Sequence, residues 1–382
     1  MNTAFKDLLK PALEWLPSLL PKIGSRHSIG LYVGHDRLNL VQMEQATDNA
    51  CIRAIASISY PCSRDELFQH PQKLKALLNQ AYAMQPFKGK HVVSCLPADQ
   101  IKIITTSYHY TEGQPDAAAV AAELRARLKE ELDGMVVDFM TLRQEESDSG
   151  QREALVALAP RDKVVAYLDL LTSAGLKVDA LDIGPAALTR LVVHAGAIHE
   201  PEFPILPNVL LVNFGAESSF LTVIWGRRLM LDRAVEFSEN RIFSRLEQVL
   251  KMPQELAMHL LYEKNAASDM QPHNATETDQ MVTEVLRSEM ALLLQEVNKT
   301  LVYMASRTRG KSVDKIYLAG RVARYPGILD YLREQLHVSV NVLDPVEVFA
   351  TEKCRSHDQG LGTMAGIALA TGLALRGVPE HG

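Results

Sequence analysis

Two short stretches of the chain share the same alternation of apolar strands around a polar turn. Residues 28–44, SIGLYVGHDRLNLVQME, hold two apolar runs on either side of a turn at 34–37, and residues 208–226, NVLLVNFGAESSFLTVIWG, repeat the design. Both predict a β-hairpin. A constant offset matches Leu31 with Val212, Gly34 with Gly215 and Leu40 with Leu221. This repeat predicts a duplicated α/β fold whose two halves enclose a cleft.

The region between the two hairpins has a different pattern. Residues 90–106 predict a strand, and a helix at about 115–133, strands near 136–144 and 153–159, and a helix at 160–174 follow. This βαββα order predicts a small inserted subdomain. After the second hairpin we expect a polar loop at 265–280, a long helix at 281–307, a strand at 315–319 and a helix at 326–336. The Gly- and Ala-rich stretch 361–375 predicts a last helix packed closely on a sheet.

These patterns divide the chain into five segments. We expect an N-terminal segment at 1–27, a first half at 28–89 and 176–205, an insert at 90–175, a second half at 206–345, and helices at 346–382 that return to the first half.

The N-terminal segment carries one apolar stripe at helical spacing. The stripe runs from Phe5 to Leu20, is interrupted by Pro11 and Pro17, and is flanked by basic residues at positions 6, 10, 22 and 26. Docking on an anionic membrane surface or on a partner is one interpretation. A loosely ordered tail, or a helix packed on its own body, is the other.

Composition excludes several classes of protein. The formal net charge is −6 and no long basic run occurs, which argues against a nucleic-acid binder. The four cysteines form no CxxC pair, so a zinc site or a disulfide framework is not expected. No stretch has the roughly 18 apolar residues of a membrane span, and we see no signal peptide. We therefore expect a cytoplasmic protein.

Familiar catalytic motifs are missing or incomplete. TRGKS at 308–312 lacks the earlier glycine of a P-loop, because Ala305 stands there, and it follows an expected helix instead of a strand. No GxSxG or HExxH pattern occurs, and the histidines have no metal-ligand spacing.

The order of several short motifs resembles the PilM family of type IV pilus biogenesis, within the actin-like ATPases. The resemblance rests on five stretches: GLYVGHDRLNLV at 30–41, LTSAGLKVDALDIGPAALTR at 171–190, VNFGAES at 212–218, LAGRVARYPGI at 318–328 and ALATGLALR at 368–376. The resemblance implies an actin-like (ribonuclease H-like) duplicated fold with an inserted SHS2-like βαββα subdomain, a grouping shared with FtsA. It also implies nucleotide contacts from the two hairpins and from an adenosine turn, here Gly34, His35, Asp36, Asn213, Gly215, Ala216, Glu217, Ser218, Gly320 and Arg321.

Departures from the family pattern affect this nucleotide site. The two metal-holding aspartates are replaced by Tyr32 and Asn213, and neither side chain carries the negative charge that favours Mg²⁺. Asn39 stands where a lysine is common, and Arg321 replaces the second glycine of the adenosine turn. The family's A-E-x-x-K helix aligns with Ala257 to Leu261, which lacks its Glu and Lys. The remaining glycines are also explained by turn geometry alone.

These features favour a non-catalytic scaffold of a type IV or MSHA-like pilus platform. The resemblance implies peripheral inner-membrane association through a short cytoplasmic peptide of a bitopic partner, PilN. The sequence does not establish a cofactor, and ATP with Mg²⁺ is the candidate that the resemblance implies. Self-association is left open. The alternatives are an ATP-binding family member, a small-molecule kinase of the same superfold and an FtsA relative. Asn213 and Glu217 are weak candidates for a kinase base, and FtsA ends in a membrane-targeting helix, whereas this sequence ends in RGVPEHG.

Overall fold

The computed structural model describes residues 28–45, 50–128, 132–142, 150–199, 206–266, 277–308, 310–349, 365–376 and 378. The predicted N-terminal segment 1–27 and most of the predicted loop 265–280 lie outside this range. The chain forms two compact units, of which unit 1 is 1–190, 349–355 and 369–382, and unit 2 is 191–348 and 356–368. The division falls within helix α6 (Gly184–His199), not at the predicted residue 206.

A five-stranded mixed sheet forms the centre of unit 1, in the order β3-β2-β1-β4-β8. The antiparallel strands β1 (Ile29–Val33), β2 (Arg37–Gln45) and β3 (Ala50–Ser59) form one side, and β4 (His91–Cys95) and β8 (Lys177–Asp182) continue it in parallel. Apolar side chains of α3 (Pro71–Met84) and α5 (Arg161–Ser173) share a buried core with this sheet. The short α2 (Arg64–Gln69) begins at Ser63, whose hydroxyl accepts from the Glu66 N–H.

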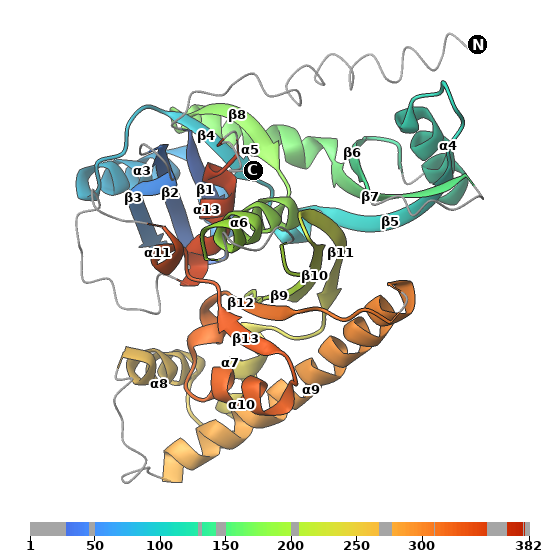
Figure 1. Cartoon of the computed structure of the whole chain (residues 1–382). Coiled ribbons are helices and arrows are strands. Elements are labelled where there is room, and N and C mark those ends of the chain that lie inside the picture. The colour runs from blue at the N-terminus through green and yellow to red at the C-terminus, as the bar shows by residue number, and fades with distance from the viewer. Residues whose placement is uncertain are drawn as a thin grey trace. The chain divides into compact units, whose positions relative to one another are not determined.

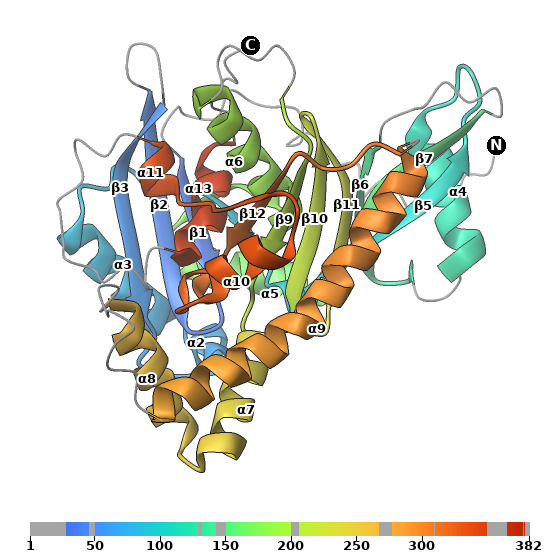
Figure 2. The same ribbon diagram turned by 60° about the horizontal axis from the view of Figure 1, so that its bottom comes forward.

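Unit 2 repeats this sheet topology in the order β11-β10-β9-β12-β13. Its strands are β9 (Val209–Asn213), β10 (Ser219–Trp225), β11 (Arg228–Val235), β12 (Lys315–Ala319) and β13 (Ser339–Val342). The helices are α7 (Glu239–Leu250), α8 (Gln254–Ala266), α9 (Glu277–Arg307), α10 (Ile328–Gln335) and α11 (Pro345–Val348). Figure 2 shows the 31-residue α9 running beside α7 and α10, with which it encloses the core of this unit.

The predicted internal repeat is present in the backbone pairing. Leu31 pairs with Leu40 in the first hairpin, and Val212 pairs with Leu221 in the second, which are the positions matched by the sequence offset. In both units the first strand of the hairpin also pairs in parallel with the next strand of the sheet. The duplicated hairpin prediction is therefore confirmed, together with the actin-like class of the fold.

The Gly- and Ala-rich C-terminal helix packs closely on unit 1, as predicted. A Cβ at Gly30 of β1 would lie 1.9 Å from the carbonyl oxygen of Ala370 in α13 (Ala368–Ala374). A Cβ at Gly372 of α13 would lie 2.1 Å from the Ala187 carbonyl oxygen of α6. Real atoms cannot approach so closely, so glycine is required at both positions for α13 to fit between β1 and α6.

The insert is smaller than predicted. Its three-stranded antiparallel sheet has the order β5-β7-β6, from β5 (Lys102–His109), β6 (Met135–Thr141) and β7 (Gln151–Pro160), with α4 (Asp116–Leu128) on one face (Figure 1). The predicted boundaries of 90 and 175 are wrong. Residues 91–95 are β4 of the main sheet, because His91–Ser94 continue its parallel pairing, and Tyr167 of α5 is buried in the main core.

Candidate functional site

The turn of the first hairpin holds three predicted site residues, Gly34, His35 and Asp36. The Gly34 N–H donates to the Arg37 carbonyl at 2.9 Å, and a Cβ at Gly34 would lie 3.0 Å from the same oxygen. The Tyr60 hydroxyl donates to the Arg37 carbonyl at 2.8 Å, and the Tyr60 N–H donates to the Asp36 carbonyl. This turn is thus fixed by backbone contacts and by Tyr60, a residue that the sequence did not single out.

Tyr32 stands at the first position where the family resemblance expects a metal-holding carboxylate. Its side chain packs against a buried apolar cluster formed by Val93, Cys95, Ala187 and Leu373. Burial raises the pKa of the Tyr32 phenol, and the nearby Cys95 raises it further, so the side chain is neutral at physiological pH. Tyr32 therefore fills apolar space and offers no negative charge to a metal ion.

Asn39, the position of the common lysine, is held in a buried polar network. The Ser57 hydroxyl donates to Asn39 Oδ1 at 2.8 Å, and Arg37 Nε donates to Ser57 Oγ at 2.9 Å. Arg37 also donates to Ser59 Oγ at 2.6 Å. This network links β2 to β3, so these polar groups hold the sheet together.

The turn of the second hairpin contains Gly215, Ala216, Glu217 and Ser218, just after Asn213 at the end of β9. A Cβ at Gly215 would lie 2.3 Å from the Ser218 carbonyl oxygen, which explains the glycine by geometry. The first N–H groups of α7, those of Glu239 and residue 240, donate to the Gly215 and Ala216 carbonyls at 3.0 Å. The N-terminus of α7 thus binds the turn, and Ser238 caps this helix by accepting from the Arg241 N–H.

The turn at 318–328, which corresponds to the family's adenosine turn, lies beside the second hairpin in unit 2. Ala319 of β12 pairs with Asn213, and a Cβ at Gly320 would lie 2.2 Å from the Phe214 carbonyl oxygen. Gly320 also has a φ of +94°, a conformation that side chains disfavour. The structure therefore brings Asn213, the 215–218 turn, Gly320 and Arg321 together.

Arg321 is engaged in a partly buried ion pair. Its guanidinium donates to Glu239 Oε2 at 2.6 Å, and the Tyr325 hydroxyl donates to Glu239 Oε1. The Glu239 and Arg321 side chains are 4% and 16% exposed, respectively. Sequence reasoning missed Glu239 and Tyr325, because Glu239 stands 82 residues before Arg321 and no motif joins them.

These residues do not fit ATP with Mg²⁺ in the way the family resemblance expects. The two positions for metal-holding carboxylates are neutral, and the glycine expected beside the adenosine is an arginine paired with Glu239. Glu217 is exposed in its turn. The helix that aligns with the A-E-x-x-K pattern is α8, where Met258 and Leu261 stand at the Glu and Lys positions. Within the described residues, no three His, Cys, Asp or Glu side chains group as metal ligands.

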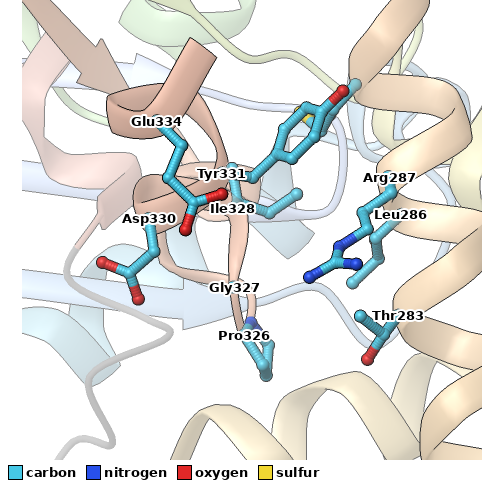
Figure 3. A pocket seen from close by; sticks show the side chains of 10 residues that line it. Thr283, Leu286, Arg287, Pro326, Gly327, Ile328, Asp330, Tyr331 and Glu334 are labelled. Carbon is cyan, nitrogen blue, oxygen red and sulfur yellow. The ribbon is translucent and has the colours of Figure 1, made fainter.

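A surface hollow in unit 2 lies apart from the predicted residues. It has a volume of about 200 Å³ and is lined by α9 and the beginning of α10. Figure 3 shows Arg287 on the α9 side and Asp330 and Glu334 on the α10 side. None of the ten predicted site residues lines it.

The described helices include none that is both long and apolar enough to cross a bilayer. The longest, α9, carries charged residues among its apolar ones along its 31 residues.

Two solved structures are similar to this chain. The solved structure "PilM-PilN type IV pilus biogenesis complex" is similar, with a TM-score of 0.72 and 22% identity over 92% of this chain and 98% of that one. The ethanolamine utilization protein EutJ from Carboxydothermus hydrogenoformans gives a TM-score of 0.49 with 16% identity, covering 94% of this chain and 99% of that one. No functionally curated sequence is significantly similar.

A family model described as type IV pilus assembly protein PilM matches residues 30–378. The match begins at the Gly30 contact with α13 and extends beyond α13, so it includes both hairpins, the insert and the 318–328 turn. The chain belongs to the PilM family of type IV pilus assembly proteins.

Proposed function

We propose that the protein is a scaffold of a pilus assembly platform at the inner membrane, with a nucleotide site that no longer hydrolyses ATP. It binds a short cytoplasmic peptide of a bitopic membrane partner similar to PilN. The similarity to a PilM–PilN complex structure supports the choice of partner. The observation that carries the scaffold proposal is the partly buried ion pair between Arg321 and Glu239 at the predicted adenosine turn.

The loss of hydrolysis follows from charge. In phosphoryl transfer the protein positions a metal ion and orients the attacking water, and carboxylates commonly do both. Tyr32 packs in an apolar cluster, and Asn213 is a neutral amide. Both hairpin turns have a structural role in their own unit. Tyr60 binds the turn of the first hairpin, and the N-terminus of α7 binds the turn of the second.

The peptide is proposed to lie beside the insert, where unit 1 offers both apolar and charged groups. On β6, Val136 and Met140 are 41% and 38% exposed. Asp138 stands between them and lies within electrostatic range of Arg376 and Asp182. Arg376 pairs with Asp182 at 2.9 Å, and Arg190 pairs with the same carboxylate at 2.5 Å. This cluster fixes the end of α13 to β8 and forms a charged border for an apolar surface.

Membrane association is proposed to need two contacts. The stripe from Phe5 to Leu20 is too short and too interrupted by proline to span a bilayer. Its flanking lysines could each add about 1 kcal/mol near an anionic surface. One such weakly bound segment gives marginal membrane binding, so the partner's peptide supplies the second contact.

The test is co-purification from cells that make the membrane partner. The full-length protein is expected to retain the partner, and removal of the partner's cytoplasmic peptide is expected to abolish recovery. Partner recovery that is unaffected by this truncation would contradict the proposal. Fractionation of cells lacking the pilus membrane proteins tests localisation, because a protein still wholly membrane-bound there does not need the partner.

A further inference from the structure

Helix α9 carries large apolar side chains on the side that faces away from the core of unit 2. Leu292 is 42% exposed, Tyr303 46% and Val302 71%, the highest value among the large apolar residues of the described chain. Figures 1 and 2 both show α9 at the outside of this unit. Single exposed apolar residues are ordinary, but these three share one side of one helix and therefore form a surface on which another helix can pack.

The spacing of the exposed residues on this side is that of a helix-pairing surface. Six exposed positions follow each other in alternating steps of four and three residues: Ser288, Leu292, Gln295, Lys299, Val302 and Ser306. Such alternation keeps side chains on one side of an α-helix and lets two helices interlock their side chains. Besides its buried side, α9 thus has a second side that is suited to pairing with another helix.

The residues of this surface are self-complementary when their order is reversed about Val297. Leu292 stands five positions before Val297, and Val302 stands five positions after it. Glu296 and Lys299, which carry opposite charges, lie between the two apolar ends. Reversal therefore brings an apolar end onto an apolar end and the acidic residue close to the basic one. A two-fold interface requires this property, because both copies contribute the same patch.

We propose that two copies of the protein associate through α9, with antiparallel helices related by a two-fold axis at Val297. Leu292 of each copy then lies against Val302 and Tyr303 of the other copy, so one apolar contact forms at each end of the paired segment. All of these residues belong to unit 2. The contact therefore needs no part of unit 1.

The charges at the centre favour this antiparallel pairing. Glu296 of each copy lies beside Lys299 of the other copy. Within one chain Lys299 donates to Glu296 at 2.6 Å, and Arg233 of β11 pairs with the same carboxylate. The Lys299 side chain is 65% exposed, and an ammonium has three N–H donors, so it can contact both carboxylates. Parallel helices would instead oppose Glu296 with Glu296 and Lys299 with Lys299, and opposed like charges cost free energy.

The contact is small, so the dimer should be weak. Residues 288–306 span roughly 27 Å of helix. One helix pair of this length buries less than the roughly 1,600 Å² of a standard protein–protein interface. We therefore expect a dissociation constant on the order of 10 to 100 μM. The pairing depends neither on the proposed membrane partner nor on nucleotide, so its failure would leave the proposed function intact.

The test is sedimentation velocity of the full-length protein from about 1 μM to about 500 μM, over which the natural protein should change from monomer to dimer. Lys299→Glu and Glu296→Lys should each weaken dimerisation about tenfold or more, because two copies of either variant place like charges across the axis. An equimolar mixture of the two variants should restore dimerisation, because acid again faces base. Arg287→Glu makes the same charge change as Lys299→Glu on the α10 side of α9 and should have no effect.

Val302→Ser removes an apolar contact and leaves the charge pairs in place. Because Val302 is so exposed, this variant should fold normally and should dimerise about threefold more weakly or worse. A natural protein that stays monomeric up to about 500 μM would overturn the inference. Dimerisation unchanged in both Lys299→Glu and Val302→Ser would do the same, as would folded charge variants whose mixture stays monomeric. Dimerisation lost on deletion of residues 1–27 would assign the contact to that segment and would also overturn the inference.

Discussion

Arg321 and Glu239 form an ion pair, with the Arg321 guanidinium 2.6 Å from Glu239 Oε2, although 82 residues separate them in the sequence. The pair joins the turn after β12 to the first residue of α7, and α7 in turn binds the Gly215 and Ala216 carbonyls. The 215–218 turn and the turn after β12 are thus joined through α7 by this ion pair and by two backbone hydrogen bonds.

Loss of one member of this pair should destabilise unit 2. Glu239→Gln removes the carboxylate that the Arg321 guanidinium and the Tyr325 hydroxyl contact, and loss of one member of this partly buried pair should cost about 1 to 3 kcal/mol. Urea unfolding of the variant should show a clearly lower midpoint. The double variant with Arg321→Met should recover part of the loss, because the guanidinium that lost the Glu239 carboxylate is then also removed. A Glu239→Gln protein as stable as the natural one would contradict the structural role of the pair.

Because α13 packs closely on its neighbours, the loss of stability on replacing a glycine by alanine should depend strongly on which glycine is replaced. Gly30→Ala and Gly372→Ala force backbone atoms apart, because their Cβ atoms would lie about 2 Å from Ala370 and Ala187 carbonyl oxygens, and each should lower stability by ~3 kcal/mol or more. The control is Gly184→Ala, whose Cβ would lie 3.9 Å from Leu369 Cδ1. Differential scanning fluorimetry should show large losses for the first two and little change for the third. Equal shifts for all three would refute the close approach.

Asp232 gives unit 2 an unusual pH dependence. Its buried carboxylate accepts from the Thr222 hydroxyl at 2.6 Å, and burial raises its pKa from 3.8 to about 6, while the hydrogen bond opposes the shift. Between about pH 4 and 6 the native state therefore holds a proton that the unfolded state has lost. The contribution of Asp232 to the free energy of unfolding should fall by about 3 kcal/mol as pH rises through this window, and then level off.

The measurement is urea unfolding from pH 4 to 7.5 of the natural protein and of Asp232→Asn. The asparagine can accept from Thr222 and does not titrate, so the difference in stability between the two proteins isolates the carboxylate. The variant should gain relative to the natural protein as pH rises to about 6. A difference that is independent of pH would show that Asp232 does not titrate in this range.

The elements that sequence predicted best are those fixed by local pattern. The two hairpins were placed in register because turn glycines and alternating apolar residues, such as Leu31 and Leu40, lie within a few positions of each other. The boundary of the insert was misplaced because β4 joins β1 by parallel pairing with a partner some 60 residues away, and its own pattern does not say which sheet it joins. Glu239 was missed because its partner Arg321 is also distant in the sequence, and an ion pair between distant residues produces no recognisable motif.

Phosphate release should be negligible. Tyr32 and Asn213 supply no carboxylate for the metal ion, so purified protein with [γ-³²P]ATP and Mg²⁺ under single-turnover conditions should release no phosphate above a buffer control. Phosphate release by a contaminating ATPase should be the same in preparations of the Gly215→Ala and Asn213→Ala proteins. Release that disappears in both variants would establish hydrolysis at this site and contradict the scaffold proposal.

A scaffold that does not use ATP should bind its partner equally well with and without nucleotide. The most direct test is calorimetric titration of the partner's cytoplasmic peptide into the full-length protein, with and without saturating ATP and Mg²⁺. Because the Arg321–Glu239 pair already joins the turns of unit 2, we predict dissociation constants that agree within about twofold, a coupling free energy below about 0.5 kcal/mol. A change of tenfold or more on adding ATP and Mg²⁺ would contradict the account and would favour an ATP-regulated assembly protein.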